Sequence, residues 1–145
     1  MKYLHTMIRV RDVDASLRFF CEGLGLQLKR RDDYPQGKFS LIFLAAPESL
    51  DAEIELTWNW PADDGSDAED YGSARNFGHL AFQVNDIYAT CAHLQAMGYT
   101  ISRPPRDGHM AFVRSPDLIS VELLQKGGNL PPTEPWVSMP NIGAW

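Results

Sequence analysis

Apolar and polar residues alternate in two short segments of the chain, "HTMIRV" beginning at His5 and "HLAFQV" beginning at His79. A period of two residues is typical of a β-strand that buries one face. In each segment the histidine falls on the face opposite the more apolar residues. The pattern therefore predicts two strands, each of which carries an imidazole on its less apolar side.

The residues that follow these two strands indicate that the chain repeats itself. Val10, Asp12 and Ala15 of the first segment recur in order as Val84, Asp86 and Ala89 of the second. Further on, "IELT" recurs as "VELL", with a drift in spacing that small deletions in connecting loops explain. The chain therefore consists of two copies of one unit of about 65 residues, longer than the periods of solenoid repeats.

Each copy is expected to contain a strand, a helix and three more strands. Asp12 or Asp14 is the expected N-cap of the first helix and Asp86 that of the second, because apolar residues follow both at helical spacing. The later strands are expected at about 26–31, 38–45 and 52–59, and again at about 99–103, 110–114 and 119–125. One helix covers only one face of a four-stranded sheet, so the other face remains available for function.

Length and composition agree with a folded α+β protein. The chain has 145 residues, 44% of them hydrophobic, and no apolar run long enough to span a membrane. Its net charge of −6 argues against a nucleic-acid partner, and the charged amino terminus does not resemble a secretory signal. A cytoplasmic location is expected by default. Cys21 and Cys91 fall in the two predicted helices and are expected to be free, buried thiols.

The repeat also predicts a metal site. Alternation in the last strand of each copy places Glu55 and Glu122 on the face away from the helix, the same face as the histidines. A single histidine at the start of a strand is usually an ordinary surface residue, but here each histidine recurs together with a glutamate. Two imidazoles and two carboxylates suit a divalent ion such as Zn²⁺, Ni²⁺ or Co²⁺. The predicted ligands are His5, Glu55, His79 and Glu122.

The two remaining histidines are weaker candidates. His93 falls on the second predicted helix, away from the sheet face, and is expected to be solvated. His109 opens a strand in "RDGHMAF", where it is either a substrate contact or a plain residue at the end of a loop.

Four motifs, found in order over residues 1–126, resemble one family: "YLHTMIRVRDVDASLRFF", "IELTWNW", "RNFGHLAFQVNDI" and "AFVRSPD" followed by "SVELL". They closely resemble glyoxalase I, the lactoylglutathione lyases of the vicinal oxygen chelate (VOC) superfamily. The resemblance implies two tandem βαβββ units that form a curved mixed sheet around a metal site. It implies one domain over 1–126, with units at about 1–60 and 77–126, and a C-terminal tail at 127–145.

The resemblance also implies an activity, the metal-dependent isomerisation of the glutathione–methylglyoxal hemithioacetal to S-lactoylglutathione. In this family a glutamate at the metal moves a proton between adjacent carbons, and by position Glu122 is that base, with Glu55 as its pseudo-symmetric partner. One Ni²⁺, Co²⁺ or Zn²⁺ ion is expected per site. Paired sheets from two chains often build the family's site, so a homodimer with sites at the subunit interface is expected.

Further residues are implied as substrate contacts, because glutathione carries carboxylates. The resemblance assigns this role to Arg9, Asn59 and Arg75, and the cationic loop of the family corresponds less closely to Arg106 and His109. Leu118 stands where the family usually has glycine, which is expected to alter a turn without removing the ligand Glu122. Trp136 and Trp145 are expected to pin the proline-rich tail across a partner subunit or the rim of the pocket.

Two other functions remain open from the sequence. Besides a glyoxalase I, the chain could be another metal-dependent VOC enzyme, such as an epimerase or a lyase for a different thiol adduct. A non-enzymatic binding protein of the same fold is the third possibility, against which the four intact ligand positions argue.

Overall fold

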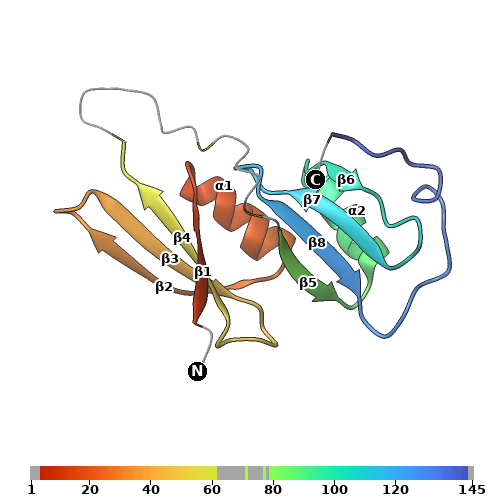
Figure 1. The fold of residues 1–145 in the computed structure, drawn as a ribbon, viewed down its shortest axis with the longest axis horizontal. Helices are drawn as coiled ribbons and strands as arrows, with labels where there is room; N and C mark the ends of the chain where they lie inside the picture. Colours follow the sequence, from red (N-terminus) through yellow and green to blue (C-terminus); the bar gives the residue numbers. More distant parts are fainter. Residues whose placement is uncertain (1–3, 62–70, 72–76, 78, 144–145) are drawn as a thin grey trace. The chain divides into compact units, whose positions relative to one another are not determined.

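The computed structural model describes residues 4–61, 71, 77 and 79–143, which form two compact units. The first unit comprises Met1–Ser73 and the second Ala74–Trp145. Each contains a four-stranded mixed sheet and one helical segment (Figure 1). The predicted tandem βαβββ architecture of the α+β class is confirmed.

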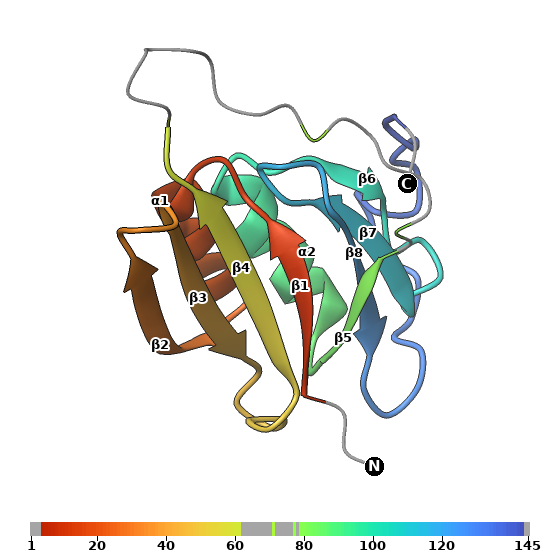
Figure 2. The ribbon, with the colours of Figure 1, turned by 60° about the vertical axis from the view of Figure 1, so that its left-hand side comes forward.

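In the first unit the strand order is β1-β4-β3-β2. The first and last strands of the βαβββ pattern, β1 and β4, are parallel neighbours. The pairs β4–β3 and β3–β2 are antiparallel. Figure 2 shows this sheet with the helix behind it. The elements are β1 (His5–Arg9), α1 (Val13–Leu17), η1 (Arg18–Gly23), β2 (Gln27–Tyr34), β3 (Phe39–Ala45) and β4 (Glu53–Asn59).

The second unit repeats this arrangement, with the order β5-β8-β7-β6. Again the first and last strands, β5 and β8, are parallel, and the other pairs are antiparallel. Its elements are β5 (Leu80–Val84), α2 (Ile87–Ala96), β6 (Ile101–Arg103), β7 (Met110–Arg114) and β8 (Ser120–Gln125).

The helices begin at aspartates, as the sequence predicts. The side chain of Asp12 accepts a hydrogen bond of 2.9 Å from the backbone N–H of Ala15, and Asp86 accepts one of the same length from Ala89. Such a side chain satisfies a backbone donor that the first helical turn leaves unpaired. The first helix does not stay α-helical, because it continues from Arg18 to Gly23 as the wider π-helical segment η1.

One face of each sheet carries the apolar core. Alternate residues of the strands and the inner residues of the helices are fully buried, and burial of such side chains is the main stabilising contribution to the fold. The core includes Phe20, Ile42, Leu44 and Leu56 in the first unit and Ile87, Leu94, Val113, Val121 and Leu123 in the second. The opposite face of each sheet is therefore free to carry polar residues.

The turn before β8 contains a backbone conformation that favours glycine. Leu118 has φ of +63°, in the left-handed region that L-residues with a Cβ rarely adopt. Hydrogen bonds hold the turn: Leu118 N–H donates to the Ser115 carbonyl at 2.9 Å, and Ile119 N–H donates to the Ser115 hydroxyl at 3.1 Å. The turn therefore keeps a glycine-like conformation in spite of the leucine, and β8 follows in regular register.

The C-terminal tail packs on its own unit. Trp136 is 5% exposed and its ring stacks on that of Tyr88 in α2, with centroids 6.5 Å apart. The Tyr88 hydroxyl donates to the Pro131 carbonyl at 2.9 Å. Trp136 therefore anchors the tail to α2 of its own unit, and the expectation that the tail crosses a partner subunit or the pocket rim stays a prediction. Trp145 lies outside the described residues.

Both cysteines are free, as predicted, but only Cys91 is buried, whereas Cys21 is partly exposed. Burial raises the pKa of the Cys91 thiol to about 12, and burial together with the nearby Glu22 carboxylate raises the pKa of Cys21. Thiols held in the protonated form are poor nucleophiles. Among the described residues no helix is long and apolar enough to cross a membrane.

Candidate functional site

The sheet face away from α1 brings His5 and Glu55 together. The imidazole Nε2 lies 3.2 Å from the Glu55 Oε2, and the other carboxylate oxygen accepts a hydrogen bond of 3.2 Å from Thr57. In the parallel pairing of β1 with β4, the residue opposite Glu55 is Met7. The two side chains therefore meet diagonally across neighbouring strands.

The second unit repeats this contact. His79 Nε2 lies 3.1 Å from Glu122 Oε2, and the residue opposite Glu122 in the β5–β8 pairing is Ala81, two positions after the histidine. The glutamates are 13% and 14% exposed and the histidines 39% and 43% exposed in the two units. Sequence, register, distance and exposure therefore all repeat.

Each histidine also packs against a phenylalanine of its own sheet, in β3 for the first unit and in β7 for the second. The His5 ring meets Phe43 edge-on, with centroids 6.0 Å apart and planes at 79°. His79 meets Phe112 in the same way, at 5.5 Å and 83°. These phenylalanines lie directly opposite Glu55 and Glu122 in the antiparallel pairings. Sequence reasoning missed them, although their recurrence in the repeat was a signal that pointed to them.

The donor atoms of each pair fit two neighbouring ligands of one metal ion. Ligand atoms about 2.1 Å from a metal lie roughly 3.0 Å apart at a right angle and roughly 3.4 Å apart at the tetrahedral angle. The observed separations of 3.2 Å and 3.1 Å fall between these values. In neither unit do three or more His, Cys, Asp or Glu side chains of the described residues group as a metal site. Each unit therefore brings together one His–Glu pair whose spacing would suit a metal ion, and this pair is called a half-site.

A third acidic residue stands beside the half-site of the first unit. Glu53 lies opposite His5 in the β1–β4 pairing, but its two oxygens are 2.8 and 3.0 Å from Nη1 of Arg30. The Arg30 guanidinium carbon lies 3.5 Å from the centre of the Phe43 ring. The hydrogen bond to Glu53 and the charges of Glu53, Asp32 and Glu55 raise the pKa of Arg30. Sequence reasoning did not find this pair.

The predicted substrate contacts are distributed over both units. Arg9 lies at the end of β1 on the same face as His5 and opposite Thr57, and Asn59 ends β4. Both side chains are exposed. Arg75 lies outside the described residues. His93, as expected, is exposed on α2.

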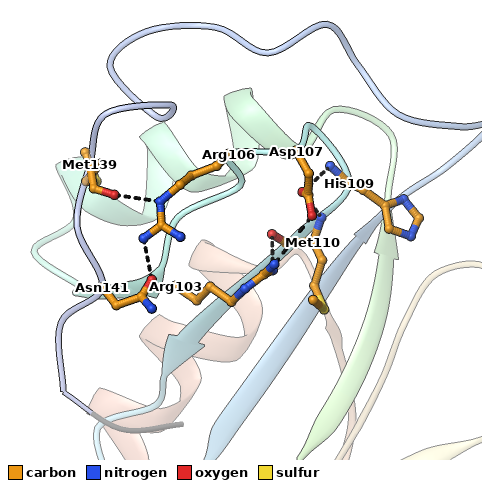
Figure 3. A network of polar contacts seen from close by, with 7 residues as sticks. All are labelled: Arg103, Arg106, Asp107, His109, Met110, Met139 and Asn141. Carbon is orange, nitrogen blue, oxygen red and sulfur yellow. Dashed lines mark hydrogen bonds and ion pairs between the residues drawn. The ribbon is translucent and has the colours of Figure 1, made fainter.

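Arg106 is bound by the C-terminal tail (Figure 3). Its Nε donates to the Met139 carbonyl at 2.9 Å and its Nη2 donates to Oδ1 of Asn141. Leu130 N–H donates to the carbonyl of Gly108 at 3.0 Å, and a Cβ on Gly108 would overlap this residue. The tail thus holds the loop in which both Arg106 and His109 occur.

Asp107 organises the same loop. Its Oδ1 accepts hydrogen bonds from the backbone N–H groups of His109 and Met110, and Arg103 lies 3.4 Å from its Oδ2 (Figure 3). Burial alone would raise the pKa of Asp107, but these bonds and the arginine charge lower it below its usual value. His109 Nδ1 is buried and has no hydrogen-bond partner among the described residues.

Comparison with known proteins supports the resemblance. Residues 2–123 match the Glyoxalase/Bleomycin resistance protein/Dioxygenase superfamily. The chain is 46% identical to a probable lactoylglutathione lyase of Synechocystis, covering 86% of this chain and 95% of that one. It is 40% identical to a lactoylglutathione lyase of Haemophilus influenzae, covering 86% and 93%.

A solved structure agrees with both. The trypanothione-dependent glyoxalase I of Leishmania major superimposes with a TM-score of 0.75 at 36% identity, covering 87% of each chain. The family match over most of the chain and the identities above 30% are independent of the duplicated His–Glu geometry. The chain therefore belongs to the glyoxalase/bleomycin resistance protein/dioxygenase superfamily.

Proposed function

We propose that the chain is a lactoylglutathione lyase, which converts the hemithioacetal of glutathione and methylglyoxal to S-lactoylglutathione and so removes methylglyoxal. The observation that carries the proposal is the His–Glu pair, which recurs in both units with donor atoms 3.2 and 3.1 Å apart. The names of relatives at 40–46% identity that cover most of the chain support the same activity.

In this proposal His5, Glu55, His79 and Glu122 hold one divalent ion. Nickel, cobalt and zinc all accept imidazole and carboxylate ligands, so the donor set is compatible with each of them. When bound, such an ion acts as a Lewis acid and stabilises negative charge on the substrate oxygens.

Glu122 is the proposed general base. The reaction moves a proton from the carbon that bears sulfur and hydroxyl to the neighbouring carbonyl carbon. The hydroxyl proton moves to the former carbonyl oxygen, so substrate and product are isomers. A carboxylate in reach of both carbons can accept the proton and return it. Glu55, its counterpart in the first unit, lies in a matching environment with 13% exposure, and it is the proposed partner on the opposite side of the substrate.

Positively charged and polar side chains are proposed to bind the glutathione carboxylates. Arg9 and Asn59 lie at strand ends on the functional face of the first unit, and Arg75 has the same role by resemblance. Arg106 and His109 complete the proposed set, although two donors of Arg106 are already bonded to the tail. Guanidinium groups suit carboxylates because they donate two parallel hydrogen bonds.

We further propose a cytoplasmic homodimer in which each site takes His5 and Glu55 from one chain and His79 and Glu122 from the other. The reason is that, over the described residues, each unit brings two candidate ligands together, whereas a catalytic site of this type uses at least three protein ligands. A symmetric dimer joins the half-sites in two equivalent pairs.

The direct experiment is reconstitution of the metal-free protein. The protein is stripped with a chelator, loaded separately with Ni²⁺, Co²⁺ or Zn²⁺, and assayed for S-lactoylglutathione formed from glutathione and methylglyoxal. The proposal predicts no turnover without metal and restored turnover with at least one of the three ions. If the protein is folded and loaded with metal but produces no S-lactoylglutathione, the proposal is wrong.

A different thiol cosubstrate is the second candidate. The related Leishmania structure is described as trypanothione-dependent, so the identity of the thiol varies within this family. Parallel assays with the hemithioacetals of glutathione, trypanothione, bacillithiol and mycothiol separate the cases by their kcat/KM values. Activity with none of them, together with tight ligand binding, would instead favour the non-enzymatic binding protein.

A further inference from the structure

The functional face of the first unit carries one carboxylate more than the proposed site requires. Glu53 and Glu55 are two residues apart on β4 and therefore lie on the same face of the sheet. By backbone register it is Glu53, not Glu55, that lies opposite His5. The imidazole nevertheless pairs with Glu55, and the Glu53 carboxylate is turned to Arg30.

Arg30 is held where it can capture this carboxylate. The pairing of β2 with β3 is irregular between Leu28 and Arg30, and this bulge places Arg30 directly opposite Phe43. The guanidinium then lies over the Phe43 ring at 3.5 Å, while His5 meets the same buried ring by its edge. A cation over an aromatic face is attracted by the ring, which fixes its position. One ring thus supports both Arg30 and the metal-ligand candidate His5.

The second unit provides an internal comparison. The same bulge precedes Arg103, which lies opposite Phe112, and Phe112 lies opposite Glu122. However, the residue two positions before Glu122 is Ser120, where the first unit has Glu53. Arg103 bonds to the Met110 carbonyl at 3.0 Å and lies 3.4 Å from Asp107. The arginine is therefore present in both units, but it pairs with a strand carboxylate in the unit that has the extra acid.

This difference matters for a divalent ion. Carboxylates are good ligands for the metals proposed here, and a catalytic site must leave coordination positions for the substrate. If Glu53 were released, it would lie beside His5 as a third donor from the first unit. We infer that Arg30 is a positioning residue that holds Glu53 away from the ligands His5 and Glu55 and so keeps a coordination position open. The inference rests on the proposed function, in which these two residues bind the ion.

Four variants test the inference: Arg30→Gln, Glu53→Gln, the double variant with both changes, and Arg31→Gln as a control. Arg31 is the next residue along β2 and pairs with Asp33 at 2.9 Å, so its variant removes the same charge from a different ion pair. Each protein is titrated with Co²⁺ in competition with a chromogenic chelator. The visible spectrum of the bound Co²⁺ is recorded, because it responds to the number of ligands, and kcat is measured separately.

The expected result is that Arg30→Gln binds Co²⁺ several-fold more tightly, changes the Co²⁺ spectrum and lowers kcat by about tenfold or more. In the double variant, the Co²⁺ affinity, the Co²⁺ spectrum and kcat should all return towards the wild-type values. This recovery would also show that a protein without Arg30 folds. Glu53→Gln and Arg31→Gln should resemble the wild type in spectrum and affinity.

Three results overturn the inference. If the wild-type protein binds Co²⁺ and Arg30→Gln leaves affinity and spectrum unchanged, Arg30 has no such role while the proposed function stands. The same conclusion follows if Arg30→Gln changes both but the double variant does not reverse them. If the wild-type protein binds no Co²⁺ at all, the proposed metal site fails, and this inference fails with it.

Discussion

His79 Nε2 lies 3.1 Å from Glu122 Oε2, although Glu122 is opposite Ala81 in the parallel pairing of β5 with β8. The side chains therefore reach diagonally across two strands, and the identical diagonal joins His5 to Glu55. The two glutamates nevertheless need not have the same role, because the proposed reaction transfers one proton from carbon and needs one general base.

The first prediction separates the two glutamates. Glu122→Gln should retain bound metal but lose about 10²- to 10⁴-fold in kcat, because glutamine still offers an oxygen but cannot accept the proton. Glu55→Gln is the matched variant from the other half-site. Metal content measured beside kcat distinguishes loss of the base from loss of the ion. Equal kcat values for Glu122→Gln and the wild type would move the role of base to Glu55.

The second prediction concerns the turn before β8. Leu118→Gly should raise the free energy of unfolding by about 1 kcal/mol, since the left-handed backbone at φ +63° is strained for leucine and not for glycine. The side chain is 54% exposed, so little buried area is lost. Chemical denaturation measures the change. Leu50→Gly is the control, because Leu50 is also exposed, at 44%, but is not among the positive-φ residues, and it should bring no gain.

The third prediction concerns the tail. Trp136→Ala should destabilise the protein by roughly 3 kcal/mol, because it removes a buried ring and leaves a cavity against Tyr88. The neighbouring Val137 is 40% exposed, and Val137→Ala should change stability by less than about 0.5 kcal/mol. Thermal or denaturant unfolding of both variants checks the contrast. Equal effects would mean that Trp136 does not anchor the tail.

The fourth prediction is a pH dependence at Asp107. Its pKa is lowered in the folded protein, so its stabilising contribution is complete above the unfolded-state pKa of about 4 and is lost as the pH falls through the lower folded value. The backbone N–H groups of His109 and Met110 donate to this carboxylate, so their protection against hydrogen exchange, measured relative to the intrinsic exchange rate at each pH, should fall in acid. In Asp107→Asn the protection of these amides should lack this acid transition. An identical acid transition in the variant would assign it to another group.

The periodicity of apolar residues predicted the helices and strands well, because burial of one face of each element produces that periodicity. The later strands begin and end within a few residues of the expected bounds, and Asp12 and Asp86 cap the helices as predicted. The pairing of each histidine with its glutamate also followed from alternation and the repeat. These features depend on which face of a strand a residue occupies, and alternation specifies that face directly.

Other features depend on information that alternation does not contain. The bulge before Arg30 shifts the register by one residue and so decides which face the side chain joins. The capture of Glu53 then depends on a side-chain conformation above Phe43. Likewise, the contact of Arg106 with the tail joins residues far apart in a segment without regular periodicity. Such pairings are set by tertiary packing.

The most direct test of the shared site mixes two inactive variants. One carries His5→Ala and Glu55→Ala, and the other carries His79→Ala and Glu122→Ala, so each retains one intact half-site. If sites are shared between chains, a heterodimer contains one site in which both halves are intact and one in which both are broken. After co-refolding or subunit exchange in the presence of metal, lactoylglutathione lyase activity should recover to about a quarter of the wild-type value at equal mixing. Activity no higher than that of the separate variants would contradict the account.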